Sequence, residues 1–567
     1  MKHALLSGVA LAAGLVLVSA ARATETDQAS CQALAVKITG LAGVRLTSTA
    51  FVPEGAAAGG QPGPALSLPA HCDITGKINE RTGVNGQAYA IRFHLRLPVN
   101  WNQRFLFQGG GGSNGDIGDA LGMGAGATPA LSQGYAVVSQ DSGHDNATNS
   151  DPAHNGQVAF GFDPVARADY GHTSLKKVAD TAREIIKVYY GRKPLYSYFI
   201  GCSKGGQEGM TFATLYPDEF DGILASAPGF SLPRAAVAEA WDVQSFGALA
   251  KMPGSDKVDF MALNRTYSDS DLSLVRKAIL AGCDKDDGLA DGIVGDYLAC
   301  TDDKVLPQLQ AIACADAKTD ACLSADQIKA LVASKTGPVN SAGRNLYAGW
   351  FWPSGIAGND WRLWKIGSAD GRIPALNVLL GGPSLASVFT TPPTVLGPNP
   401  QAIVDYQMAF DMDRDAGRIY AVSAPFTTSA WHDIGSRSPD LSAFRKRGGK
   451  LMVPHGDSDP VFSLKDTLAW YDEVNDLNGG KADAFVRVFP VPGMCHCGGG
   501  QATSQYDAFT VLVSWVEKHQ APQSLLAAAS AGSPWPDRQR PICAYPLVAR
   551  YNGAGDIEKA SSFTCKA

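Results

Sequence analysis

No part of this chain restricts its fold more than residues 199–206, which run from Phe199 through Ser203 to Gly206. The apolar start of this segment predicts a buried strand, its glycines permit a sharp turn, and residues 207–215 continue in a helical pattern. A serine at such a turn is lifted above the carboxyl end of the strand, which is the geometry of a nucleophile elbow. The rest of the chain must therefore supply a sheet around this strand.

Strand-like and helix-like runs alternate on both sides of the elbow, and this alternation predicts a mostly parallel α/β sheet. We expect strands at 88–97, 104–108, 135–139, 222–226, 451–454 and 484–489, and helices at 174–190, 464–474 and 507–518. Residues 229–439 lack the alternation and are rich in tryptophan and proline. We interpret them as a lid domain inserted into an α/β domain that residues 24–228 and 440–567 form.

The N-terminus has the composition of an export signal. Lys2 and His3 precede an apolar run over 4–18, and residues 21–23 offer a cleavage site, so we expect residues 1–23 to be a signal peptide. No cysteine near that site could carry a lipid anchor, and no later apolar run is long enough to span a membrane. We expect a periplasmic or secreted monomer, and the net charge of −6 provides no basic surface for nucleic acid.

Eleven cysteines in an exported chain indicate disulfides. Four pairs are close in sequence: Cys31 with Cys72, Cys283 with Cys300, Cys314 with Cys322, and Cys543 with Cys565. The sequence does not prove this connectivity, and the odd count leaves one thiol over around Cys495-His496-Cys497. Zinc binding by that run is the alternative, although no second cluster with zinc spacing supports it.

The chain order serine, acid, histidine limits the choice of partners for Ser203. The histidines that follow it are His432, His455, His496 and His519. We expect the acid in a loop after a strand and the base in a later loop, which favours Asp459 and His496, with Asp457 as the competing acid. Asp459 would orient the imidazole, and His496 would take the proton of Ser203 and return it to the leaving alcohol.

A second glycine-flanked serine, Ser113, follows the strand predicted at 104–108, but no helical pattern follows it. We interpret its glycine-rich run as a loop that donates one backbone N–H, that of Gly112, to an oxyanion hole, with the N–H of Lys204 as the other donor. A flexible turn is the alternative for residues 109–112. Residues 141–145, which include His144, precede the nucleophile and are interpreted as a structural turn.

Residues 283–293 place four carboxylates, those of Asp284, Asp286, Asp287 and Asp291, among glycines. Hard oxygen ligands on a flexible loop suit calcium, but the spacing is not that of an EF-hand. A solvated acidic loop held by a disulfide is an equal alternative. A metal here would be structural, because nothing connects the loop to the nucleophile.

Cys202-Ser203, Asp459 and His496-Cys497 resemble, in order and spacing, the catalytic residues of the tannase and feruloyl esterase family of α/β-hydrolases. Residues 81–83, 281–294, 337–343 and 492–494 extend the resemblance over nearly the whole mature chain. It implies an α/β-hydrolase fold with a large inserted lid and a serine carboxylesterase that acts through an acyl-enzyme. The substrate would be a small aromatic ester: a terephthalate monoester, or alternatively a hydroxycinnamate or gallate ester. A peptidase or lipase and a non-catalytic binding protein are the other classes considered.

The resemblance also implies a disulfide between Cys202 and Cys497, which leaves Cys495 free, together with the four pairs named above. It implies a structural Ca²⁺ in the lid and no organic cofactor. The ligands would be the side chains of Asp284, Asp287 and Asp291 and the carbonyl groups of Leu289 and Ile293.

The substrate-binding residues are carried over in the same way. Phe462 would clamp the aromatic ring and Trp364 would be a lid tryptophan beside the site, unless both are ordinary core residues. Within the family, the chain is most similar to members that hydrolyse terephthalate monoesters, in which a lid arginine grips the free carboxylate. Arg372 is its counterpart if the loop after Trp364 is shorter, with a surface arginine as the alternative. Lys204 would then add a second positive charge.

Overall fold

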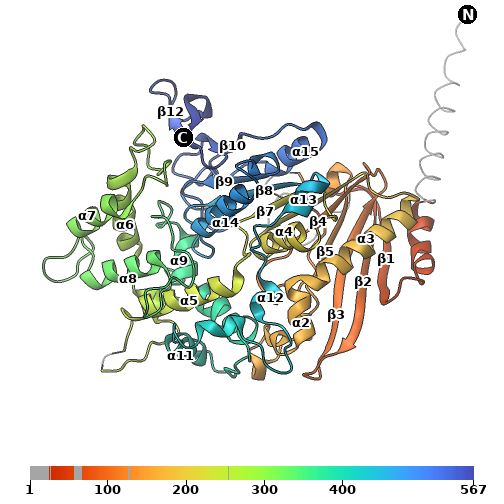
Figure 1. Cartoon of the computed structure of the whole chain (residues 1–567), viewed down its shortest axis with the longest axis horizontal. Helices are drawn as coiled ribbons and strands as arrows, with labels where there is room; N and C mark the ends of the chain where they lie inside the picture. The colour runs from red at the N-terminus through yellow and green to blue at the C-terminus, as the bar shows by residue number, and fades with distance from the viewer. Residues whose placement is uncertain (1–24, 26, 56–66, 125–127, 253) are drawn as a thin grey trace, which may run out of the picture.

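The protein is built around one mixed sheet of nine strands (Figure 1). The computed structural model describes residues 25, 27–55, 67–124, 128–252 and 254–567, so the predicted signal peptide lies outside the described residues. The strand order is β1-β2-β3-β5-β4-β6-β7-β8-β9, antiparallel from β1 to β5 and parallel from β5 to β9. The strands are β1 (Val44–Val52), β2 (His71–Thr82), β3 (Ala88–Pro98), β4 (Arg104–Gln108), β5 (Ala136–Gln140), β6 (Tyr196–Cys202), β7 (Gly222–Ser226), β8 (Lys450–Gly456) and β9 (Val486–Val491).

Helices cover both faces of the parallel part, and this explains why its strands are apolar throughout. Successive side chains of a strand point to opposite faces, so Phe105 and Phe107 join one core while Leu106 joins the other. The first core is covered by α3 (Ser174–Tyr190), α4 (Lys204–Leu215) and α14 (Leu464–Leu477), and the second by α15 (Ala508–Lys518). The expected α/β-hydrolase architecture is present.

The chain between β7 and β8 is mainly helical and has a separate hydrophobic core, which includes Val243, Phe246 and Trp361. In Figure 1 its green helices lie to one side of the sheet, opposite β1–β3. Its helices are α5 (Leu232–Gly247), α6 (Asp269–Cys283), α7 (Asp302–Ala311), α8 (Ala325–Thr336), α9 (Asn359–Lys365), α10 (Gly382–Ser387), α11 (Gln401–Met408), α12 (Ala430–Ile434) and α13 (Ser442–Arg447). Short π-helical turns precede α3 (η4, Asp169–Thr173) and α10 (η6, Asn377–Gly381), and α2 (Pro164–Ala168) precedes η4.

The C-terminal segment adds two small antiparallel sheets, β10 (Ser524–Ala528) with β11 (Gln539–Cys543) and β12 (Val548–Tyr551) with β13 (Phe563–Lys566). Disulfides join all five cysteine pairs that the resemblance implies, and Cys495 is a buried free thiol. Within the described ranges, none of the helices combines the length and the apolar character that a membrane crossing requires.

Candidate active site

The elbow serine lies between β6 and α4 in a strained backbone conformation. Ser203 has φ 64° and ψ −120°, values that a non-glycine residue rarely adopts. Close packing requires the glycines around it: a Cβ at Gly201 would lie 2.5 Å from the backbone of Gly205, and one at Gly206 2.5 Å from the carbonyl oxygen of Ser226. The glycine-flanked turn therefore holds the serine hydroxyl above the end of β6.

A continuous hydrogen-bonded chain joins the three residues proposed as a catalytic triad. His496 Nε2 lies 2.8 Å from Ser203 Oγ, and His496 Nδ1 lies 2.8 Å from Asp459 Oδ2. This is the arrangement in which an imidazole takes a proton from a serine while a carboxylate fixes its tautomer.

Asp459 is held as an anion. The backbone N–H groups of Val461 and Phe462 donate to its Oδ1, and His455 Nε2 lies 3.3 Å from its Oδ2. Burial alone would raise its pKa, but the charge of His496 and the hydrogen bonds from both histidines outweigh burial and hold the pKa below its usual range.

The competing acid faces elsewhere. Asp457 Oδ1 accepts hydrogen bonds from the Gly493 N–H and the Ser458 hydroxyl, and its Oδ2 has no partner among the described residues. Burial raises its pKa to about 7 against these hydrogen bonds. Asp457 therefore stabilises the loop that carries His496.

The other candidate histidines lie outside the chain of hydrogen bonds that reaches Ser203. His432 is largely exposed beside Asp433, and His519 ends α15. His455 is fully buried, with Nδ1 2.9 Å from Thr467 Oγ1 and Nε2 3.1 Å from the Phe462 carbonyl oxygen. It contacts the same Asp459 oxygen as His496, but of these two described residues only His496 is hydrogen-bonded to Ser203. Sequence reasoning missed the contact with Asp459, because His455 is in β8 and Asp459 is in the loop after it, where a spacing of four residues does not predict a contact.

The disulfide between Cys202 and Cys497 links the sequence neighbours of Ser203 and His496, with a Cα–Cα distance of 6.0 Å. It joins segments 295 residues apart in the chain, so it restricts the relative motion of nucleophile and base. Because Cys497 is in this disulfide, the alternative of a zinc site at residues 495–497 is wrong.

The glycine-rich loop after β4 packs on the first turn of α4. Glu208 anchors it, since its Oε2 accepts the Gly110 N–H at 3.0 Å and its Oε1 accepts the Asn114 amide at 3.0 Å. Gly112 and Lys204, whose N–H groups are the proposed oxyanion donors, line the same pocket as Ser203. No helix follows Ser113, in agreement with its interpretation as part of a loop.

The side chain of Lys204 is not available as a second positive charge for a substrate. It is 1% exposed, its Nζ lies 3.0 Å from Glu208 Oε1, and it lies over the ring of Tyr170 at 4.6 Å. Burial lowers the pKa of Lys204, and the charge of Glu208 opposes the change. The ion pair therefore supports the oxyanion loop.

A pocket opens at Ser203 beneath the helical segment. Apolar side chains form most of its wall: Leu232, Trp364, Leu380, Phe389, Val461 and Phe462. The rings of Phe462 and Trp364 lie edge-on to the His496 imidazole, with centroids at 5.3 and 5.5 Å. Both aromatic residues that the resemblance implies are thus brought to the triad.

Arg372 is not in this pocket. Its side chain is 85% exposed, its Nε lies 3.5 Å from Asp370 Oδ2, and it does not line the pocket. Leu380 and Gly381 of the π-turn η6 line the wall instead, and Arg372 is a surface arginine, as the alternative interpretation has it. The expectation of an Arg372 carboxylate grip is therefore wrong.

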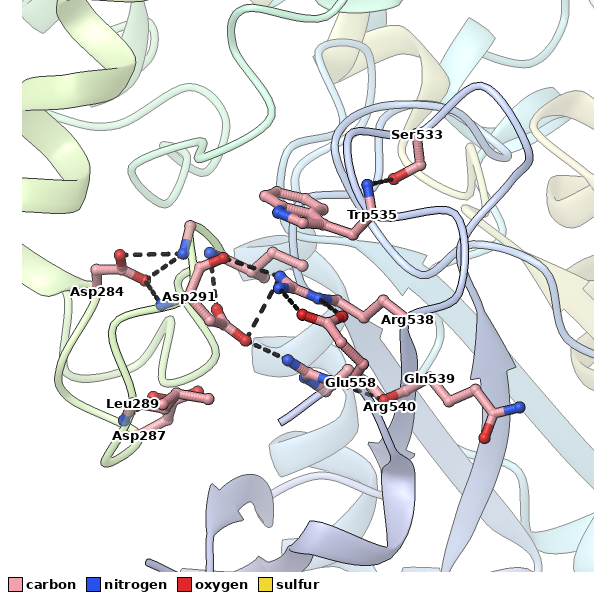
Figure 2. Close-up of polar contacts among 12 residues, drawn as sticks. Asp284, Asp287, Leu289, Asp291, Ser533, Trp535, Arg538, Gln539, Arg540 and Glu558 are labelled. Carbon is pink, nitrogen blue, oxygen red and sulfur yellow. Dashed lines mark hydrogen bonds and ion pairs between the residues drawn. The ribbon is translucent and has the colours of Figure 1, made fainter. Parts of the chain in front are cut away.

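The acidic loop contacts the C-terminal segment (Figure 2). Asp291 pairs with Arg540, and its Oδ2 lies 3.5 Å from Arg538, which is itself paired with Glu558 and packed on Trp535. Among the residues that the structure describes, no three potential ligands form a ready-made metal centre.

The oxygen donors of the loop nevertheless have the chemistry that calcium prefers. Asp287 is 5% exposed; burial and, secondarily, the nearby charges of Asp291 and Asp284 raise its pKa to about 7, while the Leu289 N–H opposes the rise. Asp284 accepts the N–H groups of Asp291 and Gly292. A cation among these carboxylates would relieve their repulsion, and it would share Asp291 with the arginines.

The fold and the triad geometry agree with comparisons to known proteins. The model of the family "Tannase and feruloyl esterase" matches residues 72–566. The chain belongs to this family. It is a carboxylic ester hydrolase, in agreement with the activities for which the members of the tannase and feruloyl esterase family are named.

Three relatives represent the family. Mono(2-hydroxyethyl) terephthalate hydrolase of Piscinibacter sakaiensis is 42% identical over 527 residues, which cover 89% of this chain and 86% of the relative. A probable feruloyl esterase of Arthroderma benhamiae is 30% identical over 85% of this chain and 83% of the relative. The crystal structure of an esterase from Aspergillus oryzae superposes with a TM-score of 0.74 at 25% identity and covers 95% of this chain and all of that chain.

Proposed function

We propose that this esterase hydrolyses esters of small aromatic acids through an acyl-enzyme formed on Ser203. The observation that carries the proposal is the unbroken Ser203–His496–Asp459 chain in a pocket whose walls are aromatic and aliphatic. A flat apolar acyl group fits between such walls, and their apolar surface excludes water from the reacting bond.

The first half-reaction follows from the geometry. Ser203 Oγ attacks the ester carbonyl carbon while His496 Nε2 takes the hydroxyl proton, and the carbonyl oxygen becomes an oxyanion. The N–H groups of Gly112 and Lys204, which line the pocket with Ser203, would donate to that oxyanion. As the intermediate collapses, His496 returns the proton to the leaving alcohol. Water, deprotonated by His496, then releases the acid in the second half-reaction.

The pocket favours acyl groups without a free carboxylate. Its one basic lining residue among those described is Lys204, which is already paired with Glu208. Moving a carboxylate from water into an apolar site without a cation costs several kcal/mol. We therefore favour hydroxycinnamate or gallate esters. The terephthalate monoester is the second candidate, supported by the 42% identity to a terephthalate-monoester hydrolase.

Relative rates on three esters test this proposal. We expect kcat/KM at neutral pH to be higher for methyl ferulate or methyl gallate than for mono(2-hydroxyethyl) terephthalate. A preference for the terephthalate monoester would contradict the assignment and establish the second candidate. Turnover of triglyceride or casein alone would contradict both.

We also propose that residues 229–439 act as a lid, that the protein is exported, and that the acidic loop binds a structural Ca²⁺. The helical segment over the pocket supports the first, and five disulfides support the second. The buried, mutually repelling carboxylates of Asp287 and Asp291 support the third. The bound ion would neutralise them and hold the loop.

Thermal unfolding with added metal tests the calcium proposal. We expect CaCl₂ to raise Tm relative to EDTA-treated protein, by a stabilisation of about 2.7 kcal/mol at a free concentration one hundred times Kd. Asp287→Asn should remove most of this shift. Asp286→Asn is the matched control, because Asp286 pairs with Lys304 and is outside the proposed ligand set. An equal shift in both variants, or none in the wild type, would contradict a site at this loop.

A further inference from the structure

One carboxyl group in the pocket has no part in the chemistry above. Glu239, on the pocket-facing side of α5, lines the pocket together with Ser203. It is 9% exposed and stands in an otherwise apolar buried stretch over residues 235–240. No hydrogen bond from a described residue stabilises its carboxyl group. Because the carboxyl group lines the pocket and no described group donates to it, it is open to a hydrogen bond from a molecule bound there.

None of the charged groups that the structure describes near Glu239 forms a hydrogen bond with its carboxyl group. Lys365, on α9, is hydrogen-bonded to Asp242 and lies over the Trp350 ring at 4.2 Å. Asp242 lies one turn along α5. Tyr170 of η4 donates its hydroxyl to the Gly112 carbonyl oxygen, and burial and, to a lesser extent, the charge of Glu239 raise the pKa of that hydroxyl. Burial raises the pKa of Glu239 to about 8, the charge of Asp242 adds to the rise, and Lys365 opposes it. The group is therefore mostly protonated at neutral pH.

The backbone opposite leaves room for this carboxyl. A Cβ at Gly381 would lie 2.1 Å from Glu239 Oε2. Gly381 has φ −66° and ψ −47°, a conformation open to any residue, so the requirement for glycine here is one of space alone. Because residue 381 is glycine, the Glu239 carboxyl group fits beside it and forms a polar site in an otherwise apolar part of the pocket wall.

We propose that Glu239 is a specificity-determining residue that hydrogen-bonds a hydroxyl substituent on the aromatic ring of the substrate. A protonated carboxyl both donates and accepts, which matches a hydroxyl group. A ring carboxylate would instead lose its hydration beside an acidic group with no free cation. This inference rests on the proposed aromatic esterase function and adds the residue that would select among aromatic acids.

Esters that differ at one ring position give the sharpest test. The probes are the 2-hydroxyethyl esters of benzoate, 4-hydroxybenzoate and terephthalate, with methyl cinnamate and methyl 4-hydroxycinnamate as a longer pair. At about pH 6.5 the phenols are neutral. We expect the wild type to prefer the hydroxylated member of at least one pair by about tenfold in kcat/KM, the value of one hydrogen bond.

Three variants separate the role of Glu239 from a general loss of fold. Glu239→Leu should abolish the hydroxyl preference and retain turnover of the unsubstituted ester, with no drop in Tm. Glu239→Gln should keep much of the preference, since an amide also donates and accepts. Gly381→Ala, which displaces the carboxyl without changing residue 239, should reproduce the Glu239→Leu result.

The pH dependence is an independent readout. In the wild type, the ratio of kcat/KM for the terephthalate monoester to that for the benzoate ester should fall as pH rises through about 8, because Glu239 becomes an anion. In the Glu239→Gln protein the ratio should stay flat.

Two results would overturn the inference alone: an unchanged hydroxyl preference in Glu239→Leu, or a selective loss of terephthalate-monoester turnover in that variant. Failure of the wild type to hydrolyse any of the five esters would overturn the proposed function together with it.

Discussion

Ser203→Ala should lower kcat on any aromatic ester by about 10⁶, because no acyl-enzyme can form without the nucleophilic oxygen. The pocket walls are unchanged in this variant, so it should still bind the substrate. For a substrate whose wild-type KM equals its dissociation constant, the Kd of the variant should stay within a few-fold of that KM. Single-turnover kinetics and the mass of the trapped acyl-enzyme measure the effect. A mass increase on the peptide that contains Ser203 should be present in the wild type and absent in the variant.

Ser113→Ala is the matched control for Ser203→Ala. Like Ser203, Ser113 has a glycine two residues before it and another two residues after it. It lines the same pocket but lies in a loop that no helix follows, unlike the serine of an elbow. Its loss should cost at most about tenfold, the size of one neutral hydrogen bond. If Ser113→Ala were the inactive variant and Ser203→Ala the active one, the assignment of the nucleophile would be wrong.

The sequence predicts the parallel half of the sheet well, because its strands are buried on both faces and appear as apolar runs bounded by turns. The strands predicted at 88–97, 104–108 and 222–226 correspond to β3, β4 and β7 within one residue. In contrast, β1 and β2 were missed. These antiparallel strands have one partly exposed face, and the end of β2 contains Asn79, Glu80 and Arg81, which break its apolar alternation.

The triad was predictable because each member follows a recognisable strand, whereas the lid side of the pocket was not. Which face of η6 and α5 points to Ser203 depends on the packing of the inserted helices, so Arg372 was placed in the wall that Leu380 and Gly381 form. The sequence also contains a feature that could have identified Glu239 as a functional residue. A single carboxylate within the apolar run over residues 235–240 requires a partner or a ligand.

Asp459→Asn should lower kcat by about 10⁴ with little change in KM, because an amide cannot hold the His496 tautomer that accepts the serine proton. In the wild type, Asp459 accepts from His496 at 2.8 Å and from two backbone N–H groups. The backbone hydrogen bonds keep the side chain in place after substitution, so the loss should appear in the chemical step. Burst and steady-state kinetics with a nitrophenyl ester separate that step from product release.

Asp457→Asn is the control, since it changes a fully buried carboxyl two residues away. Its partners, the Gly493 N–H and the Ser458 hydroxyl, can both donate to an amide oxygen, so kcat should stay within about tenfold of the wild type. Its pKa is raised to about 7, so its contribution to stability is full below about pH 4 and is lost as pH rises through 7. The Tm of Asp457→Asn relative to wild type should therefore increase between about pH 4 and about pH 7 and level off above pH 7. Equal loss of kcat in the two variants would mean that the loop, and not the Asp459 carboxylate, controls the orientation of His496.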